Sequence, residues 1–456
     1  MRTAFASALT GSGLWQRAMR SSALTMGGFA TSQALRLLSN LVLTRLLFPE
    51  AFGMMAIVAM VSSGLMMFSD VGVTPAIMQS KRGDDPAFLD TAWSIQVARG
   101  ITLFLIGCAA GVPMAWFYNQ PMFMAMMPVS ALALLLAGFN PTRLDTANRH
   151  LALGRVTAID IAAQILSLGV AIALARLTGS VWSLVISGVV SAALVLAFYT
   201  WLLPGHRNRL AWERSAAHEL IHFGKWIFLS TVVGFAFHQG DKLVLGKALP
   251  LDTFGIYNIG YFLASFPMLL GGLVVRRVLI PVYRETPPAE SRENFLKLRR
   301  MRFIVTATLM ALLAAVALLG VWLVGLLYDP RYHLAGPVVA LLALMQTPFV
   351  IVLTYDQAAL AAGDSRRFFV LQSARAALMI GGLLIGVQMA GLLGAILGQG
   401  AALLLAYPVV VWLARHQKAW DPLHDLVFGL CAIVIAALTI WRDGAYILEL
   451  AAPVTG

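Results

Sequence analysis

The sequence predicts an all-α polytopic membrane protein made of two parallel six-helix bundles and at least one extra helix at the carboxy end. Hydrophobic residues fill 59% of the 456 positions and charged residues 12%, whereas soluble domains average about 45–50% apolar and about 25% charged residues. Apolar stretches of roughly 20 residues, long enough to cross a bilayer as helices, recur along the chain. Thirteen are expected, near 22–47, 52–79, 88–117, 122–140, 155–177, 180–203, 219–248, 252–281, 301–327, 335–361, 366–390, 391–413 and 423–441.

An internal repeat predicts the two bundles. Leu41–Gly53 (LVLTRLLFPEAFG) and Leu243–Gly255 (LVLGKALPLDTFG) lie 202 positions apart, and six of their thirteen positions are identical. Each copy joins the end of one apolar stretch to the start of the next. Six helices per half return the chain to its starting side, so we expect halves related by a pseudo-two-fold axis along the membrane normal. Glycine pairs continue the repeat at offsets of 209 and 212: Gly154/Gly363, Gly179/Gly391 and Gly188/Gly400.

The expected domains follow from this repeat. Residues 1–21 contain three arginines and no apolar core before a cleavage site, so we expect a cytoplasmic tail and not a cleaved signal peptide. The longest loop is expected at Arg284–Arg302, and the residues after Trp441 are too few and too interrupted to span. The remaining domains are an N-terminal six-helix bundle (22–203), a cytoplasmic linker (204–218), a C-terminal six-helix bundle (219–413) and an extra transmembrane segment with its tail (414–456).

The net charge of +12 is distributed unevenly among the connections. If alternate connections are assigned to the two sides of the membrane, the side of the amino terminus holds 21 Lys and Arg residues and the other side holds five. Such a bias on short loops is the positive-inside rule, which places the amino terminus in the cytoplasm. The basic surplus therefore faces anionic headgroups, and no nucleic-acid partner is expected.

Several motifs of this chain resemble one family of transporters: Thr44–Gly53 (TRLLFPEAFG), Phe68–Gln79 (FSDVGVTPAIMQ), Phe223–Gly255 with its DKLVLGKAL, and Leu327–Pro337 (LYDPRYHLAGP) followed by Ala359–Gly363. Over residues 22–415 the chain resembles the oligosaccharide flippases of the polysaccharide transport (PST) family, in the multidrug/oligosaccharidyl-lipid/polysaccharide (MOP) superfamily. Members usually have twelve or fourteen helices, whereas thirteen are expected here.

The resemblance implies a multi-pass protein of the bacterial inner membrane with no enzymatic activity of its own. It implies that the chain moves undecaprenyl-diphosphate-linked oligosaccharide from the cytoplasmic to the periplasmic leaflet by alternating access, for exopolysaccharide, capsule or O-antigen synthesis. The partners would be the lipid-linked oligosaccharide, membrane lipids, a coupling ion (H⁺ or Na⁺) and polysaccharide polymerase or export machinery.

Polar side chains within the apolar stretches indicate a binding site. Intramembrane charges normally face the bundle interior or a wet cavity. Gln33, Arg36 and Asn40 share one face of the first stretch, and the offset of 202 pairs Arg36 with His238 and Asn40 with Lys242. With Arg99 and Arg375, the mid-membrane charges are mainly basic, which suits a diphosphate. The predicted substrate-binding residues are therefore Arg36, Arg99, Lys242, Arg375, Gln33 and Asn40, and the ion-coupling candidates are Asp241 and His238.

Structural explanations remain open for several of these residues. Asp241 and Lys242 are adjacent and could neutralise each other. Arg99 and Arg375 could pair with acids or backbone carbonyls, and His238 could be a hydrogen-bonded interior histidine. The glycines at Gly271, Gly272, Gly381, Gly382 and Gly386 are explained most simply by close helix packing.

Two alternative functions also remain open. His218–His222 (HELIH) matches H-E-x-x-H, whose spacing on a helix suits a zinc protease. The match lies where a basic linker enters an apolar stretch and no third ligand follows, so we expect coincidence, with no metal, no cofactor and no catalytic residue. A multidrug or cation antiporter of the same architecture would be expected to carry an excess of mid-membrane acids, and the bases predominate here.

Overall fold

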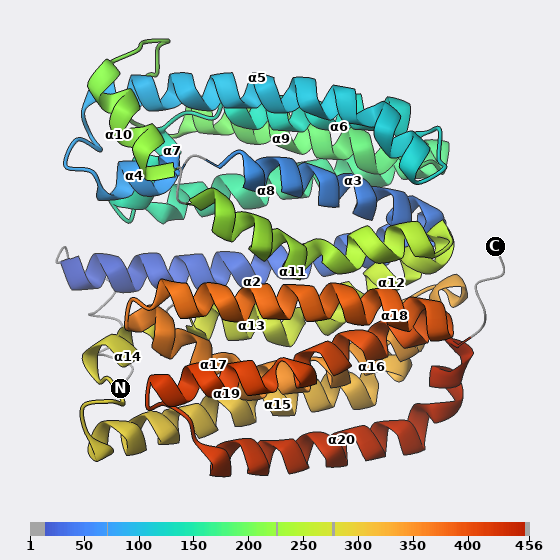
Figure 1. Cartoon of the computed structure of the whole chain (residues 1–456). Helices are drawn as coiled ribbons and strands as arrows, with labels where there is room; N and C mark the ends of the chain where they lie inside the picture. Colours follow the sequence, from blue (N-terminus) through green and yellow to red (C-terminus); the bar gives the residue numbers. More distant parts are fainter. Residues whose placement is uncertain (1–13, 71, 225–226, 276–278, 452–456) are drawn as a thin grey trace, which may run out of the picture. The chain divides into compact units, whose positions relative to one another are not determined.

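The computed structural model describes residues 14–70, 72–224, 227–275 and 279–451, without the side chains of 14–25, 221–230 and 365. All regular structure in these residues is helical (Figure 1). The chain divides into two compact units. Unit 1 comprises Met1–Leu47 and Val58–Val232, and unit 2 comprises Phe48–Ile57 and Val233–Gly456. The expected linker at 204–218 therefore lies inside unit 1, and the division falls further along the chain.

Unit 1 is a bundle whose helices pack in pairs. Helix α5 packs against α6, α8 packs against both α9 and α2, and α6 also packs against α9. Gly100 and Gly138 allow the close approach of α5 and α6, because a methyl on either glycine would lie within 2.8 Å of the other's Cα. The helices are α2 (Leu14–Leu46), most of α3 (Pro49–Phe68), α4 (Val73–Gln79), α5 (Pro86–Phe117), α6 (Phe123–Gly138), α7 (Arg143–Arg149), α8 (Leu153–Thr178), α9 (Trp182–Leu202) and α10 (Arg214–Gly224).

Unit 2 is a second bundle, in which α15 packs against α16 and α20, and α17 packs against α19 and α18. Its core includes a large cluster of buried apolar side chains contributed by these helices. The helices are most of α11 (Ile227–Ala248), then α12 (Leu251–Ala264), α13 (Phe266–Val274), α14 (Ile280–Glu285), α15 (Arg292–Leu327), the short 3₁₀ helix η2 (Pro330–Tyr332), α16 (Ala335–Met345), α17 (Thr347–Ala361), α18 (Ser365–Leu405), α19 (Tyr407–His416) and α20 (Pro422–Glu449).

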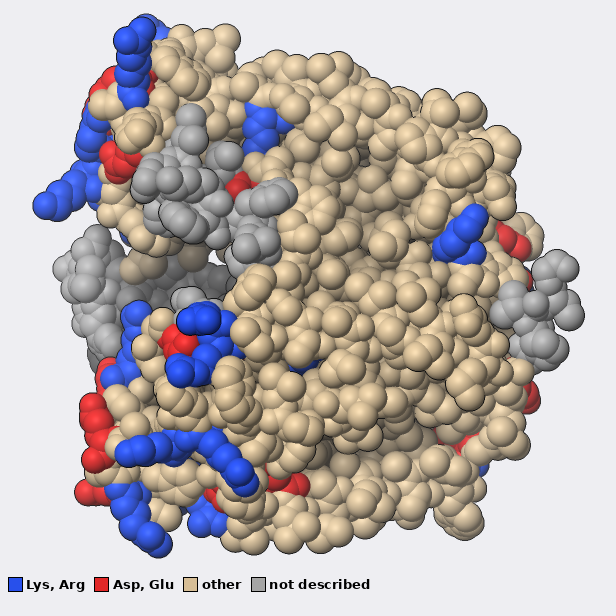
Figure 2. All heavy atoms as spheres, in the orientation of Figure 1, with Lys and Arg blue, Asp and Glu red and all other residues tan. Residues whose placement is uncertain are grey.

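The helices confirm a multi-pass membrane protein. Among the described residues, eight helical stretches are long and apolar enough to cross a membrane, or up to ten if each of two bent pairs is one span. The bent pairs are Phe123–Gly138 with Arg143–Arg149, at 58°, and Leu251–Ala264 with Phe266–Val274, at 42°. On the face shown in Figure 2, most charged side chains of each unit lie toward its helix ends, and the surface between them is largely uncharged, as contact with acyl chains requires.

The long helix α18 contains two of the predicted spans. Its backbone leaves the helical region at Ala390 and at Gly391, which has a left-handed φ of 56°. The two halves then pack closely, because a methyl on Gly382 would overlap the carbonyl oxygen of Gly398. The break thus falls at the boundary predicted between 366–390 and 391–413, and the second stretch continues past Leu405 into α19. The repeat-equivalent Gly179 also has a positive φ, of 58°, but its ψ of 15° is that of a left-handed helix cap at the end of α8, whereas Gly391 has a ψ of -133°.

The other predicted packing glycines divide into two groups. Gly271 and Gly386 approach neighbouring groups closely, whereas Gly272 and Gly381 have no neighbouring atom within 4 Å of an added methyl. Close packing therefore explains the first two and not the last two.

At three places the helices extend further than the apolar stretches indicated. Residues 14–21, predicted as tail, already belong to α2. The predicted loop Arg284–Arg302 is short, since Ser291 caps α15 by accepting a hydrogen bond from the Asn294 amide and the helix begins at Arg292. Helix α20 runs through Arg442 to Glu449. Polar residues continue a helix wherever its backbone hydrogen bonds and one packed face persist.

A buried polar cluster ties α20 into unit 2. Asp425 accepts hydrogen bonds from the hydroxyls of Tyr355 and Tyr407 at 2.7 and 2.8 Å, and His424 lies 3.0 Å from Thr306. Arg302, counted above among loop charges, is 1% exposed, and its guanidinium lies 4.5 Å from the Tyr355 ring centroid. The helix outside the duplication is therefore fixed by buried polar contacts as well as by apolar packing.

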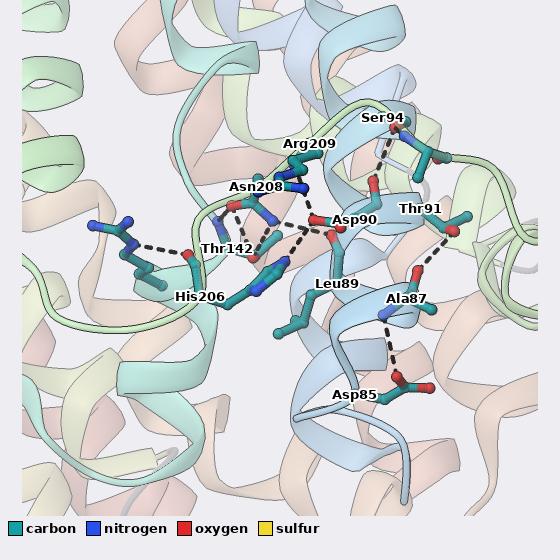
Figure 3. A network of polar contacts seen from close by, with 12 residues as sticks. Asp85, Ala87, Leu89, Asp90, Thr91, Ser94, Thr142, His206, Asn208 and Arg209 are labelled. Atoms are coloured by element: carbon teal, nitrogen blue, oxygen red, sulfur yellow. Dashed lines mark hydrogen bonds and ion pairs between the residues drawn. The ribbon is translucent and has the colours of Figure 1, made fainter.

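The segment predicted as a linker is fastened to the start of α5 (Figure 3). Asp90 accepts a hydrogen bond from the Arg209 amide at 3.0 Å and lies 2.7 Å from His206 Nε2. The Asn208 side chain accepts from the Thr142 amide at 3.0 Å and donates to the carbonyl of Leu89 at 3.3 Å. These contacts make the stretch from His206 to Arg209 part of the framework of unit 1.

Candidate functional site

The two helices that begin the repeats, α2 and α11, differ from the other long helices. Among the described helices of at least 18 residues, they are the two that are not apolar enough to qualify as candidate membrane spans. Their polar residues are the stripes that the sequence predicted. Because a polar face in contact with lipid is costly, the polar stripe of each helix is expected to face protein or water.

In unit 1 the polar stripe of α2 centres on Arg36. The Arg36 side chain is exposed and has no hydrogen-bond or ion-pair partner among the described residues. Gln33 and Asn40, on the same face, are partly buried. One turn before Arg36, Ser32 donates to Gln164 at 2.8 Å, and Gln164 donates back to the Ser32 carbonyl at 3.1 Å, which holds α2 on α8. The anchored helix thus presents a free guanidinium.

In unit 2 the carboxylate of Asp241 is buried on α11. The Tyr257 hydroxyl donates to one of its oxygens at 2.7 Å, and Gln399 donates to the Tyr257 hydroxyl at 3.4 Å. The second oxygen of Asp241 is buried without a hydrogen-bond partner. An unpaired acceptor at this depth is expensive, so it is a place where a cation or proton would be stabilised.

Lys242 and His238 lie on the stripe that is equivalent to Asn40 and Arg36. Lys242 donates to Gln239 at 2.8 Å and lies 4.8 Å from the Tyr261 ring centroid. It makes no ion pair with Asp241, so the neutralised-pair explanation is wrong. His238 is exposed and contacts the Phe237 ring, so it is not a hydrogen-bonded interior histidine.

Arg375 forms a buried ion pair with Asp356. Two guanidinium nitrogens donate to the two carboxylate oxygens at 2.5 and 3.1 Å, and the two side chains are 1% and 5% exposed. The guanidinium also lies 5.2 Å from the Phe349 ring centroid. Arg375 is therefore paired with an acid, which is one of the explanations that the sequence left open. The ion pair occupies guanidinium donors that a diphosphate would need.

Arg99 is likewise engaged within unit 1. It donates to the Ser69 hydroxyl at 2.8 Å and to the Met66 carbonyl at 2.6 Å. It lines a cavity of about 80 Å³, with Gln96 and Gly138 among the other lining residues. That volume holds a few waters, since one water needs roughly 10–15 Å³ of such space. It does not hold a sugar diphosphate.

The H-E-x-x-H match is only partly covered by the structure. His218 and Glu219 lie in α10, and the side chain of His222 lies outside the described residues. No group of three or more His, Cys, Asp or Glu side chains suited to a metal ion occurs among the residues that were described.

The aromatic partners of the charged residues were not predicted from the sequence. Tyr257 and Tyr261 flank Asp241 and Lys242, yet both lie in apolar runs that look like ordinary packing. The partnership of Asp356 with Arg375 was available from the sequence as two opposite charges on neighbouring spans, but the pairing itself depends on how the helices rotate.

Known proteins are similar to this chain in sequence and in fold. A family model described as "Polysaccharide biosynthesis protein" matches residues 42–353. The teichuronic acid biosynthesis protein TuaB of Bacillus subtilis is 22% identical over 54% of this chain, and the match spans about half (52%) of TuaB. The lipopolysaccharide biosynthesis protein WzxC of Escherichia coli is 21% identical, over 80% of this chain and 74% of WzxC.

Among solved structures, the lipid II flippase MurJ in an inward closed conformation superposes with a TM-score of 0.64 at 12% identity, covering 95% of this chain and 98% of MurJ. The likeness shows that this chain and MurJ share a fold. Because the family model matches more than half of this chain, the chain belongs to the family of polysaccharide biosynthesis proteins.

Proposed function

We propose that the protein moves a polyprenyl-diphosphate-linked oligosaccharide from the cytoplasmic to the periplasmic leaflet for polysaccharide synthesis. Its relatives are named for polysaccharide biosynthesis, and a lipid II flippase shares its fold. Alternating access by two repeated bundles would expose one binding site to each side in turn. In this proposal the chain is a transporter without catalytic residues, and lipid-linked oligosaccharide and membrane lipids are its direct partners.

The exposed, unpartnered Arg36 carries the proposal. A charge on a bundle helix costs roughly 3 kcal/mol on insertion scales unless it is paired or wet. Arg36 has no partner among the described residues, whereas Arg375 is paired with Asp356 and Arg99 donates to Ser69 and to the Met66 carbonyl. A free guanidinium presents a fork of donors to phosphate oxygens. We therefore propose that Arg36 binds the diphosphate, with Gln33 and Asn40 on the same helix as further contacts, and the substrate contact of Lys242 in unit 2 stays a prediction.

Orientation and coupling complete the proposal. The bias of 21 to five Lys and Arg residues supports an inner-membrane protein with a cytoplasmic amino terminus. The unpaired oxygen of Asp241 supports this residue as the site of a coupling H⁺ or Na⁺, with the exposed His238 one turn away. Polymerase or export machinery would take the product.

The test uses proteoliposomes that contain a fluorescent polyprenyl-diphosphate oligosaccharide. Its arrival in the opposite leaflet is measured by quenching with a membrane-impermeant reagent. Wild-type protein is expected to move the lipid, and Arg36→Ala to slow it by roughly a hundredfold, as expected for loss of a charge-assisted hydrogen bond to the diphosphate. Arg176→Ala, at the exposed end of α8, is the matched control. Unimpaired transport by Arg36→Ala, with normal folding, would reject the assignment.

A further inference from the structure

A second cavity lies in unit 1. It has a volume of about 780 Å³ and is formed where α7 meets α8 and the stretch after α9 folds back. The apolar part of its lining includes Leu89, Leu153 and Leu203, and the basic part includes His150, Arg155 and His206. A cavity lined in this way suits a molecule that has both an apolar and an anionic part.

The basic part of the lining remains positively charged although Asp84 also lines the cavity. Arg149 bonds Asp84 at 3.1 Å and His150 bonds it at 2.8 Å, so the charge of Asp84 is already matched. Arg155 is exposed and has no partner among the described residues. The cavity therefore offers a guanidinium with all its donors available.

Arg143 and the start of α8 add to the positive potential at the cavity. Arg143 is buried under Gly205 and donates only to carbonyls, those of Thr200, Leu203 and His206, so no carboxylate offsets its charge. The 26-residue helix α8 begins at the cavity with Leu153 and has no side-chain cap. Its first amides and its dipole favour an anion there.

The backbone at the cavity edge is strained. Leu151 has a left-handed φ of 57°, and its side chain is 41% exposed where it lines the cavity. A leucine in this conformation costs about 1–2 kcal/mol, and such residues gather at binding sites. Leu151 thus adds an exposed apolar side chain to the lining that also includes Arg155.

We propose that this cavity binds the phosphate group of a lipid. Arg155 and the start of α8 would contact the phosphate, and the leucines of the lining would contact the adjoining hydrocarbon chain of the lipid. Basic pockets between helices at the membrane surface recognise lipid headgroups in this way. The inference rests on the proposed function only in assigning the bound lipid to the cytoplasmic leaflet. That assignment follows from the positive-inside bias, which places these connections on the cytoplasmic side. The phosphate could belong to a membrane phospholipid or to the polyprenyl substrate.

The experiment measures lipid binding by native mass spectrometry of the purified full chain. Phosphatidylglycerol and undecaprenyl phosphate are titrated separately, each with and without inorganic phosphate as competitor. Arg155→Gln is expected to weaken binding by roughly tenfold, the factor that corresponds to one charge-assisted hydrogen bond. Ala152→Phe, which fills the cavity from an exposed position, should do the same without removing a charge.

Arg176→Gln is the matched control, because it removes an exposed arginine from the other end of the same helix. A selective effect on phosphatidylglycerol identifies a membrane phospholipid, and a selective effect on undecaprenyl phosphate identifies the substrate. Equal weakening by Arg155→Gln and Arg176→Gln, or no weakening in either cavity variant, overturns the proposal. Neither lipid titration requires transport. A negative result for lipid binding at this cavity is therefore distinguishable from a negative result in the Arg36 transport test.

Discussion

Gly53 and Gly255, equivalent positions of the two repeats, pack reciprocally at the starts of α3 and α12. A methyl on Gly53 would overlap the carbonyl oxygen of Leu251, and a methyl on Gly255 would overlap that of Pro49. Pro49 and Leu251 are themselves equivalent at the offset of 202. Reciprocal contacts of this kind define a local two-fold relationship. The repeat is thus seen directly at this contact, and the two-fold relation of the whole bundles stays a prediction.

Gly255→Ala is expected to destabilise the protein by about 2 kcal/mol, because the opposing atom is backbone and cannot move aside. Thermal unfolding of the purified protein measures the effect. Gly188→Ala, where an added methyl meets nothing within 4 Å, is the control and should change little. Equal melting temperatures for Gly255→Ala and wild type would contradict the close packing.

Breaking the buried ion pair from one side should be costly. Arg375→Met and Asp356→Leu are each expected to lower the free energy of unfolding by about 3–5 kcal/mol, because each leaves an uncompensated buried charge. The double variant should recover much of this loss, as measured by thermal unfolding. If the stable double variant still flips lipid, Arg375 is structural, and its predicted substrate contact is wrong.

Asp241→Asn is expected to remove the dependence of transport on an imposed H⁺ or Na⁺ gradient, since an amide neither ionises nor attracts a cation as a carboxylate does. Proteoliposome flipping with and without each gradient measures this. Tyr257→Phe, which removes a hydrogen bond but keeps the carboxylate, is the comparison. An Asp241→Asn protein that responds to the gradient as wild type does would exclude the coupling role.

The pH dependence of stability should reflect Asp84. The hydrogen bond with His150, helped by the nearby Arg149, holds the pKa of the Asp84 carboxyl below its usual value. A lowered pKa stabilises the folded protein above the unfolded value of about 3.9, and this contribution is lost as the pH falls toward the folded pKa. The melting-temperature difference between wild type and Asp84→Asn should therefore shrink between about pH 5 and about pH 3. A difference that stays constant would contradict this assignment.

Local chemistry and periodicity were enough to predict much of the fold. Apolar stretches predicted the membrane class, although thirteen spans were expected and the described residues hold eight candidates, or up to ten, with α2 and α11 not among them. The repeat at Leu41 and Leu243 located equivalent helices. The break inside α18 falls at Gly391, which accommodates a positive φ without strain because it has no Cβ. Composition could not predict the start of α15 at Arg292 or the burial of Arg302, since both depend on packing.

By itself the sequence determined the membrane class, the duplication and the polar character of α2 and α11. Only the tertiary structure decided which of the predicted basic residues remain free. Arg36, Arg99 and Arg375 look alike in sequence, but the rotation of each helix gives Arg375 a carboxylate, gives Arg99 a carbonyl and gives Arg36 no described partner. Charge pairing depends on distances of a few ångströms between helices far apart in the chain, and no local pattern encodes those distances.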